Sequence, residues 1–151
     1  MFHVDDCKIS HLKESVIEDL LEQLSNRFGS ETPLSVTRGA VHDYLGLTID
    51  YSVKGKVKFY MFDYIEQILN EVDPALMKGT SVTPAGTTLF KVNDDAVKLS
   101  IDVADQFHRS VAQLLFLSKR ARPDLQTAVA FLCTRVQSPD VDDLKKLGRV
   151  M

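Results

Sequence analysis

The chain has 151 residues, 44% of them hydrophobic and 26% charged, which is enough to bury one core or two small lobes. This composition excludes the disordered and collagen-like classes, and two widely spaced cysteines outside any CxxC pattern argue against a disulfide scaffold or a zinc site. The net charge of −3 weighs against a freestanding nucleic-acid-binding domain, which usually carries a basic excess.

The N-terminal third predicts a short hairpin followed by a helix. Residues 1–4 and 7–10 alternate apolar and polar side chains, which predicts two very short strands joined at Asp5 and Asp6, a polar pair suited to a turn. In residues 12–28 an apolar side chain recurs every four positions, which predicts an amphipathic helix. Gly29 is expected to end it, since glycine is preferred just after the last helical turn.

Residues 41–51 give the strongest strand pattern in the chain. Period-two alternation predicts one long strand, with Val41, Leu45, Leu47, Ile49 and Tyr51 on one face and His42, Tyr44, Thr48 and Asp50 on the other. A bend at Lys54 and Gly55 then predicts an antiparallel return strand over residues 57–61. In that return strand the apolar residues Val57, Phe59 and Met61 would lie on one face and the residues between them on the other.

The rest of the chain predicts a mainly helical lobe. A helix is expected from Asp63, with Glu66 as a weak capping-box partner, and it would bury Ile65, Ile68, Leu69 and Val72 and stop before Pro74. Residues 74–100 show little periodicity and predict a connector. Three helices follow, over about 102–119, over about 124–137 and from Asp140 onward. The expected class is α+β: an antiparallel sheet fragment with one helix, then helices. Both ends of the chain look cut, because the first residues resemble the middle of a strand and the last predicted helix continues to the final residue.

The adjacent carboxylates Asp5 and Asp6 are the first candidate for chemistry. Neighbouring aspartates on a turn are most often only solvated. A tight hairpin, however, holds carboxylates rigidly at a surface, as a site for a hard cation requires. Two Mg²⁺ ions held by carboxylates can activate a 3′-hydroxyl and stabilise a leaving pyrophosphate in phosphoryl transfer.

Basic residues gather in two stretches despite the acidic average. Lys54, Lys56 and Lys58 are spaced by two, and no acidic residue occurs between Gln106 and Pro123. The second stretch contains Arg109, Lys119, Arg120 and Arg122. The pattern leaves two interpretations open for both stretches: an ordinary solvated surface, or contacts to phosphate groups. Arg122 can also form a local turn with Asp124.

Three blocks of sequence resemble copia-type retrotransposon reverse transcriptases. Residues 2–11, Phe-His-Val-Asp-Asp-Cys-Lys-Ile-Ser-His, resemble the YxDD box of that family. Residues 41–50, Val-His-Asp-Tyr-Leu-Gly-Leu-Thr-Ile-Asp, are similar to the strand that follows the catalytic hairpin. The stretch from Phe107 to Asp124, with Ala128-Val129 and Pro139-Asp140, is similar to the later helical signature. The three blocks occur in the family's order and cover nearly the whole chain.

The resemblance implies a partial polymerase palm over residues 1–56, followed by the primer-grip return strand, a connector and a helical thumb-like lobe over residues 57–151. It implies that Asp5 and Asp6 are catalytic and bind Mg²⁺ or Mn²⁺ in the complete polymerase, whose partners are a template-primer duplex of RNA or DNA and a dNTP. The nucleic-acid contacts that it implies are Tyr44, Leu45, Gly46, Lys54, Lys56, Lys58, Arg109, Lys119, Arg120 and Arg122.

Two departures from the family pattern limit what the chain is expected to do alone. His3 replaces the usual aromatic residue of the box, and no segment corresponds to the earlier palm strand with the other metal-binding aspartate, or to the nucleotide site. We therefore expect a reverse transcriptase fragment, inactive by itself, whose partner is an upstream polymerase segment.

The alternative is a non-enzymatic remnant that binds nucleic acid or a protein. An uncovered apolar face bearing Val41, Leu45, Leu47 and Ile49 would favour self-association. The first residues show neither the basic nor the apolar region of a secretory signal, and no apolar run approaches the ~20 residues that cross a bilayer. We expect an intracellular location, in the cytoplasm or nucleus, with no membrane partner.

Overall fold

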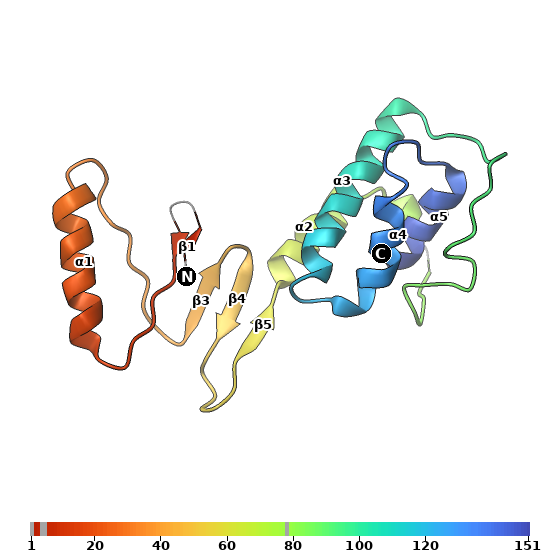
Figure 1. The fold of residues 1–151 in the computed structure, drawn as a ribbon. Coiled ribbons are helices and arrows are strands. Elements are labelled where there is room, and N and C mark those ends of the chain that lie inside the picture. The colour runs from red at the N-terminus through yellow and green to blue at the C-terminus, as the bar shows by residue number, and fades with distance from the viewer. Residues whose placement is uncertain (1, 4–5, 78) are drawn as a thin grey trace. The chain divides into compact units, whose positions relative to one another are not determined.

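The computed structural model describes residues 2–3, 6–77 and 79–151 and mixes helices with small antiparallel sheets. The α+β class expected from the sequence is confirmed. The chain divides into two compact units, residues 1–59 and residues 60–151, which are drawn in Figure 1. The assignment of residues 1–56 to a palm and of residues 57–151 to a thumb-like lobe stays a prediction.

The N-terminal hairpin is shorter than expected and its turn is placed differently. Strands β1 (Phe2–His3) and β2 (Asp6–Cys7) pair antiparallel, with Phe2 opposite Cys7 and His3 opposite Asp6. Asp6 therefore belongs to the second strand, and the prediction that it forms the turn with Asp5 is wrong. The strand predicted over residues 7–10 ends at Cys7. Asp5 lies outside the described residues.

Helix α1 (Glu14–Phe28) begins two residues later than its apolar pattern. The Lys13 N–H donates to Nδ1 of His11 at 3.0 Å, and Lys13 has an extended backbone, so the helix cannot start at Leu12. Gly29 ends the helix with φ −67°, not in the left-handed conformation that favours glycine. The reason for a glycine is close approach, because a Cβ there would lie 2.5 Å from the carbonyl oxygen of Ser25.

The single long strand predicted over residues 41–51 is wrong. The segment folds into a hairpin of β3 (Val41–Tyr44) and β4 (Leu47–Asp50), joined by the two-residue turn Leu45-Gly46. The turn residues have φ values of 53° and 72°, and positive φ at both central positions is the geometry whose twist matches paired strands. This hairpin tip, Leu45-Gly46, is exposed at Gly46 and half-buried at Leu45.

The turn also changes which residues share a face of the sheet. Tyr44 pairs with Leu47 and His42 with Ile49, so these four lie on one face, and Tyr44 and Ile49 are buried. Val41 lies on the opposite face and is 46% exposed. The expected common face of Val41, Leu45, Leu47 and Ile49 is therefore wrong, because pairing across the turn joins even-numbered residues to odd-numbered ones.

Strand β5 (Lys58–Tyr60) follows β4 in the same three-stranded sheet. The predicted bend at Lys54 and Gly55 is confirmed, with Gly55 at φ 77°. The return strand is shorter than the predicted residues 57–61, and Val57 and Phe59 are exposed.

The second unit holds the larger core. Its elements are α2 (Phe62–Glu71), the 3₁₀ turns η1 (Pro74–Met77) and η2 (Pro123–Leu125), α3 (Ile101–Ser118), α4 (Gln126–Cys133) and α5 (Val141–Val150). The predicted helices are confirmed, although α4 stops four residues early. The most deeply buried apolar side chains are those of Phe107, Val111, Ala128, Val129, Leu132 and Leu147. None of the described helices combines the length and apolar character that crossing a bilayer requires.

Two local predictions for the second unit are corrected. Leu69 is 37% exposed rather than buried, and α2 begins without a side-chain cap, so the expected Asp63–Glu66 capping box does not form. The predicted connector also packs into the unit. Leu89 is 4% exposed, and the Phe90 ring lies edge-on to the Phe131 ring at 5.6 Å between centroids.

Candidate functional site

The acidic hairpin is the first candidate site. The β1–β2 pairing fixes the backbone at His3 and Asp6 on either side of the turn. Two carboxylates at a hairpin supply the hard oxygen donors that Mg²⁺ prefers, so the residue types fit the ion. Among the described residues no group of three or more His, Cys, Asp or Glu side chains could hold a metal ion. Asp5 lies outside the residues that this finding covers, so the roles of Asp5 and Asp6 stay predictions.

The hairpin tip is the second candidate. Leu45 is the one non-glycine residue with positive φ in the described part of the chain. That conformation costs an L-residue other than glycine about 1–2 kcal/mol. Such strain is found at functional sites more often than elsewhere, which makes the tip a candidate contact.

Tyr44, next to the tip, does not share its exposure. Its side chain is 9% exposed, and its buried hydroxyl has no hydrogen-bond partner within the described residues. The expected nucleic-acid contacts Tyr44, Leu45 and Gly46 are thus contiguous in sequence but differ in access, because only the tip residues reach the surface.

The three lysines after the hairpin are exposed but do not form one strand face. Lys54 lies in the bend, Lys56 lies before the strand, and only Lys58 belongs to β5. Hydrogen bonding from Ser52 lowers the pKa of Asp50, with a smaller contribution from the charge of Lys58. A phosphate contact by these lysines stays a prediction.

The basic residues of α3 frame its contact with α2. Arg109, Gln113 and Phe116 are spaced by four and three, so they lie along one side of the helix, and Arg120 follows two residues beyond its end. Gln113 Nε2 donates to Glu71 Oε2 at 2.7 Å. Hydrogen bonds from Gln67 and Gln113 lower the pKa of Glu71, with a smaller contribution from the charge of Arg109.

Arg120 lies in the same contact. Its guanidinium stacks 3.5 Å from the centre of the Phe116 ring, which packs 5.2 Å from the Tyr64 ring. Burial raises the pKa of Tyr64. Arg120 therefore has a structural role at the α2–α3 contact, whatever further role it has toward phosphate.

Beyond the end of α3, Arg122 is paired locally. It binds Asp124 through two hydrogen bonds, of 2.9 and 2.7 Å, and these lower the pKa of Asp124. The alternative of a local turn around Pro123 is therefore confirmed. Lys119 is exposed at the C-terminal end of α3. The four predicted basic contacts thus do not form one surface of unpaired charge.

A buried ionic cluster in the second unit was not predicted from the sequence. Asp140 caps α5 by accepting from the N–H groups of Asp142 and Asp143, both at 3.0 Å. Arg135 binds Asp143 at 3.0 Å and Asp140 at 3.3 Å. Burial would raise the pKa of Asp140, but the two backbone N–H groups and nearby cations hold it below its usual value. The signal in the sequence was the Asp140-x-x-Asp143 spacing of a capping box. The cluster is structural.

Comparisons with known proteins find similarity to two curated proteins. The chain is 28% identical over 152 residues to an uncharacterized mitochondrial protein of Arabidopsis thaliana, covering 100% of this chain and 58% of that protein. It is 24% identical over 150 residues to a putative transposon Ty5-1 protein of Saccharomyces cerevisiae, covering 99% of this chain and 46% of that protein. The chain spans about half the length of these curated relatives. No protein-family profile and no solved structure matches it.

Proposed function

We propose that the chain is a transposon-derived segment of a copia-type reverse transcriptase, made of the C-terminal part of the palm and a thumb-like lobe. The observation that carries the proposal is the similarity to a transposon protein over 99% of the chain. That similarity includes both the acidic hairpin and the helical unit. The resemblance of residues 2–11 to a YxDD box supplies the finer assignment.

In this proposal Asp5 and Asp6 hold Mg²⁺ or Mn²⁺. Bound there, the ion would supply activation of a primer 3′-hydroxyl and neutralisation of charge on the leaving pyrophosphate. The chain's own contribution would be to position the two carboxylates, and the pairing of β1 with β2, which includes Asp6, supports this. The other partners are an RNA or DNA template-primer duplex and a dNTP. An enzyme with these partners works where nucleic acid is found, so we propose the cytoplasm or nucleus.

The hairpin tip would contact the primer strand. Its support is the positive φ of Leu45, which keeps an apolar side chain at a position where asparagine, aspartate or glycine would be unstrained. The exposed Lys54, Lys56 and Lys58 lie nearby in sequence and would contribute phosphate contacts. Such contacts set the register of a duplex without reading its bases.

Residues 1–151 alone are expected not to synthesise DNA. They carry no counterpart of the earlier palm aspartate or the nucleotide site, and positioning supplies most of the catalysis in phosphoryl transfer. Primer extension by the isolated chain checks this expectation. Template-dependent synthesis that disappears in Asp5→Ala would contradict it.

Mn²⁺ binding tests the metal site directly, with electron paramagnetic resonance as the readout. The variant Asp5→Asn/Asp6→Asn should lose the binding seen in the unmodified chain. A matched control exists in the same molecule, because Asp94 and Asp95 are likewise adjacent in sequence, and both are exposed and in a turn. Asp94→Asn/Asp95→Asn should bind Mn²⁺ like the unmodified chain. Equal binding by all three proteins would exclude a specific site at Asp5 and Asp6.

A second candidate is a nucleic-acid-binding module without catalysis. It is favoured by a groove between residues 84–93 and helix α5 of the second unit, which Lys91, Lys145, Lys146 and Arg149 line and which does not depend on the acidic hairpin. Duplex binding together with no specific Mn²⁺ binding would select this candidate.

A further inference from the structure

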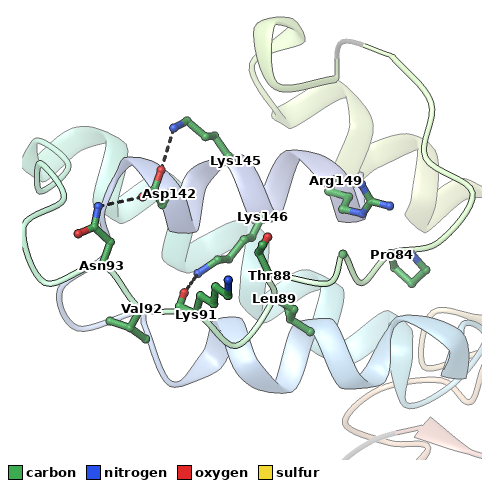
Figure 2. A pocket seen from close by; sticks show the side chains of 11 residues that line it. Pro84, Thr88, Leu89, Lys91, Val92, Asn93, Asp142, Lys145, Lys146 and Arg149 are labelled. Atoms are coloured by element: carbon green, nitrogen blue, oxygen red, sulfur yellow. Dashed lines mark hydrogen bonds and ion pairs between the residues drawn. The ribbon is translucent and has the colours of Figure 1, made fainter.

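A groove in the second unit lies between residues 84–93 and helix α5, as Figure 2 shows. Its volume is about 530 Å³. Four cationic side chains line it, those of Lys91, Lys145, Lys146 and Arg149, against the single carboxylate of Asp142. None of the nucleic-acid contacts expected from the sequence lies in this groove.

Two of the four cations have acidic partners. Lys145 Nζ lies 2.7 Å from Asp142 Oδ1. Lys146 Nζ lies 3.5 Å from Asp143 Oδ1, but that carboxylate is already bound by Arg135 at 3.0 Å. One negative charge is thus shared by two cations, and the Lys146 charge is only partly neutralised.

The other two cations have no acidic partner among the described residues. Arg149 donates from Nε to the carbonyl oxygen of Thr83 at 3.1 Å and from Nη2 to its hydroxyl at 3.4 Å. Both acceptors are neutral, so the guanidinium is held in place with its full charge. The Lys91 side chain is exposed. Asp94 and Asp95 follow on the same loop but do not line the groove.

Contacts of Lys146 also hold the two sides of the groove together. Lys146 Nζ donates to the carbonyl oxygen of Lys91 at 2.7 Å and lies 4.8 Å from the centre of the Phe131 ring. The hydrogen bond joins the loop to α5, and the ring contact joins α5 to α4. On the helix, Lys145 and Arg149 are one turn apart and therefore lie on the same side. Binding an anion here needs little further ordering of the chain.

We infer that this groove binds successive phosphate groups of a nucleic-acid backbone. A fixed arginine with unshared charge suits a phosphate oxygen. Cations spread along a helical turn and an opposing loop suit a row of phosphates better than one small anion. The choice of a polynucleotide among polyanions rests on the proposed function; the anion site itself does not.

Fluorescence anisotropy with a labelled DNA duplex and a labelled RNA–DNA hybrid tests the inference across a salt series. Each phosphate contact contributes about one unit to the slope of log affinity against log salt. Lys91→Gln/Arg149→Gln should weaken binding and lower this slope by about two units. The matched control is Lys13→Gln/Arg27→Gln, which removes one lysine and one arginine from the exposed helix α1 and its start. It should bind like the unmodified chain.

An unchanged slope in Lys91→Gln/Arg149→Gln, or an equal loss in the control, would overturn the inference. Competition by pyrophosphate or by polyglutamate as effective as by unlabelled duplex would overturn the polynucleotide assignment. Circular dichroism confirms that each variant is folded. Mn²⁺ binding distinguishes failure of this inference from failure of the proposed metal site. Lys91→Gln/Arg149→Gln should still bind Mn²⁺. Asp5→Asn/Asp6→Asn should bind the duplex with the same slope of log affinity against log salt as the unmodified chain.

Discussion

The two units differ sharply in how much apolar surface they bury. Of the sixteen buried apolar side chains among the described residues, only Tyr44 and Ile49 belong to the first unit, and the other fourteen belong to the second. Helix α1 has a regular apolar stripe, yet none of its residues is buried. Helix α3 has a similar pattern and buries Phe107, Val111 and Leu114. Periodicity thus shows which face a helix can bury. Whether that face is buried depends on whether other elements of the fold pack against it.

The largest effect should come from the core of the second unit. Leu132→Ala removes a fully buried side chain and should lower the free energy of unfolding by about 2–5 kcal/mol. Ile49→Ala in the first unit should leave the main transition in urea, followed by circular dichroism, where it is. Equal losses in the two variants would show that the units unfold together and would break the comparison.

Close packing at Gly148 should give the next largest effect. A Cβ there would lie 2.8 Å from the carbonyl oxygen of Leu76, so Gly148→Ala must push α5 away from η1. We expect a loss of about 1–3 kcal/mol in the same urea measurement. Gly86→Ala is the control, because its Cβ would meet Arg149 Nε at 3.5 Å, an ordinary contact. A similar loss in both would contradict the packing argument.

Acid should destabilise the second unit through Asp140, whose neighbours are Arg135, Lys98 and Asp143. Its pKa is lowered in the folded chain, so its stabilisation is complete above the unfolded value of about 4 and is lost as the pH falls below it. Asp140→Asn keeps a capping oxygen but loses the charge, and should cost about 1 kcal/mol at pH 7. Thermal unfolding measured from pH 7 to pH 2 should show the difference in melting temperature between the unmodified chain and Asp140→Asn disappearing at the lowest pH. A constant difference would exclude the charge as the cause.

The smallest effect is a gain at the hairpin tip. Leu45→Asn relieves the positive φ of leucine and should stabilise the β3–β4 hairpin by up to about 1 kcal/mol. Slower hydrogen exchange at the backbone N–H groups of Tyr44 and Leu47 would show the gain. Leu45→Ala keeps the strain and should show none. If the tip contacts a primer strand, Leu45→Asn should also weaken duplex binding.

The sequence was most informative where local pattern and burial agree. Helices α3 and α5 were predicted to within about a residue, because their apolar stripes face a core. The β3–β4 hairpin was missed because alternation continues smoothly through its turn. Gly46 is typical of the second position of such a turn. The first position usually holds asparagine, aspartate or glycine, and Leu45 there hid the turn.

The basic groove could not be predicted from local pattern. Lys91 lies in a segment without periodicity, and Arg149 lies on a helix many residues later, so only the packing of residues 84–93 against α5 brings them together. The acidic hairpin is the opposite case. Asp5 and Asp6 are adjacent in the chain, and their resemblance to a known box needs no tertiary structure to be seen.

RNA-templated DNA synthesis by a chimera tests the central claim most directly. Residues 1–151 would replace the corresponding segment of an active copia-type reverse transcriptase, with Asp94→Asn/Asp95→Asn as the control. We predict synthesis by the chimera and by the control, and none by the chimera carrying Asp5→Asn. Synthesis that persists with Asp5→Asn, or a folded chimera that makes no DNA, would contradict the assignment of this chain to a reverse transcriptase.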